Sequence, residues 1–261
     1  MKIIFSDYDG TLYKKDKKLL KENIKAIKVF REDGNLFCVA TGRTYLDIKR
    51  LLEKRKIPYD YVIANDGAIA FDNKGNKLYT IDIDLNDVLL VSKDIKENSG
   101  VQFWGFTDGK YIYIEKKKTN SLFLNIMYLF LRVTYYKYVP KSIDYFVKDT
   151  KVNQILVKTD SKKTPEEIRK MVFEKYPYLR AETVGPFMSI VDKRADKVFG
   201  VDFITEKLNI KKENVYTIGD NNNDINMIKK YNGFALENSI EEVKSVASKE
   251  FKEVKDAIES I

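Results

Sequence analysis

The sequence of 261 residues contains no histidine and a single cysteine, Cys38. Without histidine, Ser-His-Asp and Cys-His catalysis, phosphohistidine chemistry and histidine-ligated metal sites are excluded. One cysteine excludes an intramolecular disulfide and a multi-cysteine zinc site. Cysteine-dependent phosphatases place an arginine shortly after their cysteine, but only four residues separate Cys38 from Arg43 and the neighbours of Cys38 are apolar. We therefore expect Cys38 to be a small buried side chain.

Long apolar segments are scarce as well. The longest, Leu122–Val133, is interrupted by Asn125 and is too short to span a bilayer, so we expect a buried helix there. Met1 and Lys2 are followed by only three apolar residues before the acidic residues begin, which does not resemble a secretory signal. These features predict a soluble, cytoplasmic protein without a membrane partner.

The charge balance is basic, with a net charge of +8 and an isoelectric point near 9.1. The lysines are spread over every predicted helix and do not form one stripe, a distribution typical of solvated helix faces. We therefore do not expect a nucleic acid partner. A weaker interpretation is that the positive field attracts a small anionic substrate.

Four largely apolar segments, each predicted to be a strand, lead into polar residues. They are Ile3–Phe5, Leu36–Ala40, Tyr59–Ala64 and Val215–Ile218. Amphipathic helical patterns separate the first three, and strands alternating with helices predict a doubly wound parallel sheet, an α/β fold. Ligands of such sheets bind beyond the carboxyl ends of the strands. The polar residues after these four segments therefore mark a candidate site.

From residue 83 to residue 186 the pattern changes to helices mixed with hairpins. Examples are a predicted helix over Asn86–Asn98 and another over Pro165–Tyr176, opened by a capping box at Thr164. We therefore expect an α+β domain at 83–186, inserted into a parallel-sheet domain made of residues 1–82 and 187–261. No element is assigned to residues 250–261.

Carboxylates gather after two of the apolar segments. Asp7 and Asp9 follow the first, and Asp220 and Asp224 follow the fourth. Taken alone, the first pair could be a solvated turn. A calcium loop at 220–231 fails because Ile225 stands where glycine is required. If the strands are neighbours, Asp7, Asp9 and Asp220 can instead share Mg²⁺, whose charge would let the acids coexist.

A carboxylate that attacks a phosphate must overcome repulsion between like charges. Two unit charges at 4 Å repel by about 4 kcal/mol at an effective dielectric constant near 20. Such a site needs a metal ion and a fixed cation on the phosphoryl oxygens. Thr41 and the backbone after it can donate hydrogen bonds to those oxygens, and a lysine must supply the cation.

Four ordered segments resemble the motifs of the haloacid dehalogenase superfamily. They are Asp7-Tyr8-Asp9-Gly10-Thr11, Thr41-Gly42-Arg43, a downstream lysine and Gly219-Asp220-x-x-x-Asp224. The inserted domain resembles the α/β cap of the Cof-type sugar-phosphate phosphatases, so the resemblance covers the whole chain. It implies a Rossmann-like core with a substrate-selecting cap, and a Mg²⁺-dependent phosphatase of small phosphorylated metabolites.

The resemblance also implies roles for individual residues. Asp7 would be the nucleophile that forms an aspartyl-phosphate. Asp9 would protonate the leaving alcohol and then activate water, and its carbonyl would bind the metal. Thr41, with Gly42 and Arg43, would hold the transferred phosphoryl group.

The later motifs supply the metal ligands and the lysine. Asp7, Asp9, Asp220 and Asp224 would form the metal site, with Asn223 near the phosphate. Lys197 is preferred to Lys193 because it lies twenty-three residues before Asp220 and opens a helix, as the lysine of the family does. Val198 follows it, where the family commonly has glycine. Asn65 resembles the asparagine of the family's Asn-Gly-Ala segment, with Asp66 inserted after it.

Three other functions remain open at this point. Relatives with the same two acids are phosphomutases, which move phosphate within a sugar. A non-catalytic phospholigand-binding protein could keep the fold, and a nucleic acid binder is the most distant reading. We expect a monomer or a weak homodimer.

Overall fold

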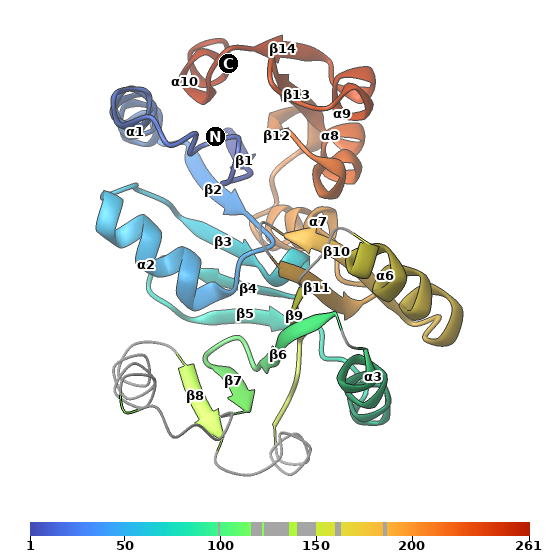
Figure 1. Cartoon of the computed structure of the whole chain (residues 1–261). Coiled ribbons are helices and arrows are strands. Elements are labelled where there is room, and N and C mark those ends of the chain that lie inside the picture. The colour runs from blue at the N-terminus through green and yellow to red at the C-terminus, as the bar shows by residue number, and fades with distance from the viewer. Residues whose placement is uncertain (99, 116–121, 123–135, 140–149, 160–162, 185–186) are drawn as a thin grey trace. The chain divides into compact units, whose positions relative to one another are not determined.

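The computed structural model describes residues 1–98, 100–115, 122, 136–139, 150–159, 163–184 and 187–261 (Figure 1). The chain forms two compact units. The first comprises residues 1–42, 48–79 and 195–261, and the second comprises 43–47 and 80–194. In the sequence, the segments of the second unit thus lie between segments of the first. The expected division into a catalytic core at residues 1–82 and 187–261 and a substrate-selecting cap at residues 83–186 stays a prediction.

The first unit is built on an eight-stranded sheet in the order β14-β13-β12-β1-β2-β3-β4-β5. Its parallel strands are β1 (Ile3–Ser6), β2 (Leu36–Ala40), β3 (Tyr61–Ala64), β12 (Val215–Gly219), β13 (Asn232–Leu236) and β14 (Lys249–Phe251). β4 (Ile69–Asp72) runs antiparallel to β3, and β5 (Lys77–Thr80) lies at the edge. The predicted α/β fold class is confirmed.

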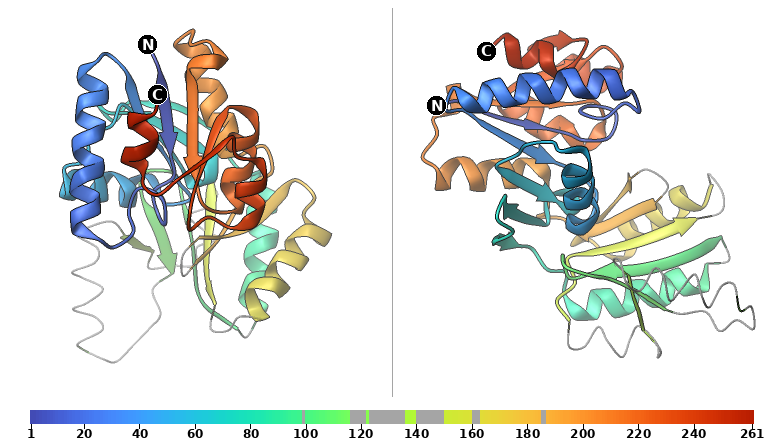
Figure 2. Two further views of the ribbon diagram at one scale, coloured as in Figure 1. Left: turned by 90° about the horizontal axis from the view of Figure 1, so that it is seen from above. Right: turned by 90° about the vertical axis from the view of Figure 1, so that its left-hand side faces the viewer.

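Helices cover both faces of this sheet, which explains why its central strands are largely apolar. On one side lie α1 (Lys17–Glu32), α2 (Tyr45–Arg55) and α10 (Val254–Glu259), with α1 and α10 in contact (Figures 1 and 2). On the other lie α7 (Lys197–Lys207), α8 (Ile225–Lys230) and α9 (Glu241–Val246). These three pack on a core that includes Ile3, Phe5 and Cys38, and Cys38 is fully buried, as expected.

The strand register determines where the polar residues meet. Ser6 of β1 is aligned with Val39 of β2 on one side and with Ile218 of β12 on the other. All three strands are parallel, so the residues that follow them emerge at one edge of the sheet. This edge carries the candidate site.

The second unit has a six-stranded sheet in the order β10-β11-β9-β6-β7-β8. The strands are β6 (Val101–Thr107), β7 (Ile112–Glu115), β8 (Tyr136–Val139), β9 (Gln154–Thr159), β10 (Leu179–Val184) and β11 (Phe187–Asp192). Helices α3 (Leu85–Glu97) and α6 (Lys163–Lys175) share an apolar core with this sheet. Because α6 begins at Lys163, Thr164 lies inside its first turn, and the predicted cap at that residue is wrong.

Three further expectations concern the C-terminal residues, the segment Leu122–Val133 and membrane-spanning helices. Residues 250–261 lie largely in β14 and α10, which the sequence pattern does not assign. The helix expected over Leu122–Val133 lies outside the described residues except for Leu122. Within the described ranges, no helix has both the length and the apolar character needed to cross a bilayer.

Candidate active site

Lys197 lies at the centre of the edge where β1 and β12 end. Its ammonium donates to Oδ1 of Asp7 and to Oδ1 of Asp224, both over 2.7 Å. Lys197 and Asp224 are fully buried and Asp7 is 7% exposed. Lys197 is the first residue of α7, whose N-cap, Asp196, accepts from the amide of Val198. The start of α7 thus places one cation between two carboxylates from distant segments.

Burial and neighbouring charges shift the pKa values of these side chains. Burial lowers the pKa of the Lys197 ammonium, but the charges of Asp224 and Asp7 outweigh burial and raise it, so the lysine stays protonated. Burial raises the pKa of Asp7 well above its ordinary value, with Lys197 opposing and Asp224 and Asp220 adding to the rise. Burial likewise raises the pKa of Asp220 to about 6.

The loop after β12 fixes Asp224. Its Oδ2 accepts from the amide nitrogens of Asp220 and Asn221, both at 3.0 Å. A Cβ atom on Gly219 would lie 2.3 Å from Cγ of Asp224, so only glycine fits there. Asp224 is therefore held by the backbone and by Lys197 together.

Asp220 is held from the β1 side. Thr11 donates its hydroxyl hydrogen to Oδ1 of Asp220. Gly10 has a φ of +89°, and a Cβ there would lie 2.3 Å from Oδ2 of Asp220. The carbonyl of Gly10 accepts from the side-chain amide of Asn238 at 3.1 Å. The turn after β1 and the loop after β12 therefore fit closely around one carboxylate.

Asp7, Asp220 and Asp224 form a candidate cation site, called here the carboxylate cluster. One carboxylate oxygen from each lies within 4.8 Å of the others. Three carboxylates face one ammonium, which leaves an excess of negative charge in a largely buried place. Oxygen donors of this kind suit Mg²⁺, and a cation would offset the excess charge. The residues present therefore fit a divalent metal.

The other predicted site residues described here, Thr41, Asp9 and Arg43, lie in different surroundings. Thr41 is 2% exposed and its amide donates to the carbonyl of Ile63 at 2.9 Å, which fixes it at the end of β2. Asp9 is exposed, and its carboxylate is not one of the three in the cluster. Arg43 forms an ion pair with Asp47, and both belong to the second unit. The role expected for Arg43 stays a prediction.

Asp66 is a residue of this edge to which the sequence assigns no role. It is fully buried, and its Oδ1 accepts from the side-chain amide of Asn223 at 3.1 Å. Its amide donates to the carbonyl of Thr41 at 3.2 Å. Asn65 and Asp66 have positive φ values of 53° and 51°, which aspartate and asparagine tolerate better than most residues. Asp66 thus ties the loop after β2 to the loop after β12.

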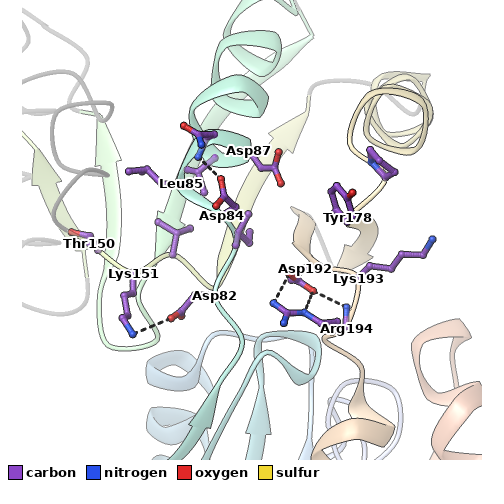
Figure 3. A pocket seen from close by; sticks show the side chains of 15 residues that line it. Asp82, Asp84, Leu85, Asp87, Thr150, Lys151, Tyr178, Asp192, Lys193 and Arg194 are labelled. Carbon is purple, nitrogen blue, oxygen red and sulfur yellow. Dashed lines mark hydrogen bonds and ion pairs between the residues drawn. The ribbon is translucent and has the colours of Figure 1, made fainter.

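The second unit contains a separate cavity of about 1350 Å³ (Figure 3). Its walls include Asp82, which pairs with Lys151 at 3.6 Å, and Asp192, which pairs with Arg194 at 2.8 Å. Among the described residues, none of those predicted to act in chemistry lines it. The candidate site is therefore the edge of the first sheet.

Comparisons with known proteins identify the family and the fold. A family model described as haloacid dehalogenase-like hydrolase matches residues 4–258. A 5-amino-6-(5-phospho-D-ribitylamino)uracil phosphatase of Bacillus subtilis is 26% identical over 249 residues, covering 95% of this chain and 88% of the relative. The solved phosphatase BT1666 of Bacteroides thetaiotaomicron is similar in fold, with a TM-score of 0.77, 22% identity and coverage of 100% and 93%. The subclass IIB sugar phosphatase BT4131 has a TM-score of 0.75, 24% identity and coverage of 100% and 98%.

Proposed function

The chain belongs to the haloacid dehalogenase-like hydrolase family and is a phosphatase of that family, and on this premise we propose a specific reaction. It hydrolyses small phosphomonoesters with the help of Mg²⁺ and through a phosphorylated Asp7. The observation that carries the proposal is the buried ammonium of Lys197, 2.7 Å from both Asp7 and Asp224, beside the carboxylate of Asp220.

In the first step, an oxygen of Asp7 attacks the phosphorus atom, and the bond between phosphorus and the alcohol oxygen breaks. Asp9 gives its proton to that oxygen, so the alcohol leaves neutral. The ammonium of Lys197 offsets the charge on the phosphoryl oxygens, and Thr41 donates a hydrogen bond to them. Asp7, Asp220 and the carbonyl of Asp9 would hold Mg²⁺, and Asp224 would support this site. The bound ion would reduce the repulsion between carboxylate and phosphate.

In the second step, Asp9 takes a proton from water, whose oxygen attacks the phosphorus of the aspartyl-phosphate. The bond between phosphorus and Asp7 breaks, orthophosphate leaves and both carboxyl groups return to their starting states. Asn223 and the Gly42–Arg43 segment are proposed to contact the phosphate.

Support for the substrate class comes from the comparisons. One relative is named for a phosphoribitylamino-uracil, and one structural neighbour is a sugar phosphatase. We infer that the substrate is a sugar phosphate or a similar small phosphorylated metabolite, that the second unit selects it, and that the enzyme acts in the cytoplasm.

The test is phosphate release from a panel of phosphorylated sugars and alcohols, with Mg²⁺ or with EDTA. We expect release with Mg²⁺, none with EDTA, and none from Asp7→Asn, whose side chain has nearly the same shape. Circular dichroism and thermal melting would show that the variant is folded. Turnover near the wild-type level in Asp7→Asn would exclude Asp7 as the nucleophile, and an isomerised sugar phosphate in place of released phosphate would identify a mutase.

A further inference from the structure

The turn that carries Asp9 is held by an aromatic stack of Tyr8, Tyr13 and Arg55, called here the tyrosine stack. The rings of Tyr8 and Tyr13 are stacked, with centroids 5.8 Å apart. The guanidinium carbon of Arg55 lies 4.0 Å from the ring centroid of Tyr13 and 5.9 Å from that of Tyr8. A cation at such a distance from a ring face is attracted by the quadrupole of the ring. The stack therefore joins the turn to the last residue of α2.

The same residues shape the backbone of the turn. The amide of Tyr13 donates to the carbonyl of Tyr8 at 2.8 Å, and the amide of Gly10 donates to the carbonyl of Tyr13 at 3.2 Å. Asp9 and Tyr13 form an isolated β-bridge. Asp9 thus sits in a tight turn and is paired, through the backbone, with the residue whose ring contacts Arg55.

Burial differs sharply along this turn. Tyr8 is fully buried, whereas Asp9 is exposed. Nη1 of Arg55 is buried and has no hydrogen-bond partner among the described residues, so the contact of the guanidinium with the two rings is its recorded interaction on this side. An exposed acid acts efficiently only if its backbone is fixed, because proton transfer requires close, aligned approach.

We propose that Tyr13 and Arg55 are positioning residues for Asp9. The proposal rests on the proposed function, in which Asp9 protonates the leaving alcohol. Neither side chain touches the reacting atoms. Together they keep the turn in one geometry, so that the carboxyl of Asp9 reaches the leaving oxygen each time a substrate binds.

The first test does not depend on activity. Amide hydrogen exchange is compared among the wild type, Arg55→Met, Tyr13→Leu and the matched control Tyr13→Phe, which keeps the ring. We expect the amides of residues 10 and 13 to exchange about tenfold faster or more in the first two variants, because local opening becomes easier. Exchange in β1 and β2 should not change, and Tyr13→Phe should resemble the wild type. Equal protection of the turn in all four proteins would overturn the proposal.

The second test separates positioning from mere loss of folded enzyme. The value of kcat/KM is measured for p-nitrophenyl phosphate and for the alkyl ester of the panel that the wild type hydrolyses fastest. Nitrophenolate leaves without a proton, so Arg55→Met should lower the alkyl value about tenfold more than the aryl value. This is less than the 10²–10⁴ that general acid catalysis supplies, because the acid is misplaced and not removed. Lys54→Met, which removes the neighbouring cation of α2, should leave the ratio unchanged.

The same ratio in an Asp9→Ala background should not respond further to Arg55→Met, since the acid is already gone. Equal falls for both esters in Arg55→Met, or no fall, would overturn the positioning role. If the wild type hydrolyses no ester, the proposed function fails, while the exchange measurement still decides whether the stack orders the turn.

Discussion

Nζ of Lys197 and Oδ1 of Asp7 lie 2.7 Å apart although 190 residues separate them in the chain. The contact is made by parallel pairing of β1 with β12 and by the start of α7 at Lys197. Since Lys197 also contacts Asp224, one side chain links the first and last motifs of the site.

Replacing Lys197 by methionine keeps the length of the side chain and removes its charge. Breaking a buried ion pair by removing one partner costs about 3–5 kcal/mol, so we expect a clear loss of unfolding free energy in urea. We also expect phosphatase activity to fall about 10²–10³-fold, because a fixed donor at the phosphoryl group is lost.

Lys193→Met is the matched control for that variant. Lys193 is exposed, and surface substitutions change stability by about 0.5 kcal/mol or less. If the two variants lost activity equally, Lys197 would have no special role.

Gly10 and Gly34 offer a matched pair for testing the close fit around Asp220. Both have a positive φ, +89° and +80°, but an added Cβ on Gly34 meets nothing within 4 Å. Alanine at either position should cost about 1–2 kcal/mol because of the left-handed backbone. Only Gly10→Ala should also weaken Mg²⁺ binding, since its methyl group would displace the carboxylate of Asp220. Calorimetric titration with Mg²⁺ measures this difference, and equal metal affinities would contradict it.

Stability of the metal-free protein should depend on pH through Asp220. Burial raises the pKa of this group from 3.8 to about 6, so the folded chain holds the proton more tightly than the unfolded chain. Its contribution to stability is therefore complete below about pH 4 and declines as the pH rises through 6. Thermal melting in EDTA should show a decline between about pH 4 and 6.5 that Asp220→Asn reduces.

Added Mg²⁺ should reverse that trend, because ionised Asp220 binds the metal and protonated Asp220 does not. At one hundred times its dissociation constant, a ligand stabilises by about 2.7 kcal/mol, which corresponds to several degrees in Tm. We expect this shift at pH 7.5 and a much smaller one at pH 5. Equal shifts at both pH values would argue against Asp220 as a ligand.

Removal of the proposed acid should leave the first chemical step intact for a good leaving group. In Asp9→Ala we expect rapid release of one nitrophenol per enzyme from p-nitrophenyl phosphate, followed by slow turnover. For alkyl phosphates, kcat/KM should fall about 10²–10⁴-fold. Stopped-flow absorbance and steady-state assays measure the two effects. Asp33→Ala, which removes an exposed carboxylate at the end of α1, is the control. Wild-type rates on alkyl esters would contradict the acid role of Asp9.

Much of the site's framework can be predicted from the sequence, because buried parallel strands appear in it as apolar segments. Continuous apolar segments ending in Asp7, Thr41 and Asp220 predict a shared sheet edge, and the register places those ends together. The choice of Lys197 over Lys193 rests on spacing and on a helix start, and Lys197 is the lysine that contacts Asp7 and Asp224.

The contacts of Asp66 and Thr11 could not be predicted in the same way. Asp66 meets Asn223 across 157 residues and Thr11 meets Asp220 across 209, through side chains on turns whose geometry no periodic pattern encodes. Thr11 stands directly after Asp9-Gly10, which is the only local signal. The end segment β14–α10 has short elements, for which hydrophobic periodicity is too brief to read.

The order of the strands has a consequence for biosynthesis. β1 is made first and its partner β12 is made after the whole second unit, so Asp7 waits unpaired while about two hundred further residues leave the ribosome at roughly 5–20 per second. A nascent or truncated chain that ends before residue 220 lacks both Asp220 and Asp224. Under the proposed function, a chain cut short before these residues would have no phosphatase activity, and only synthesis of the last part of the sequence would complete the site.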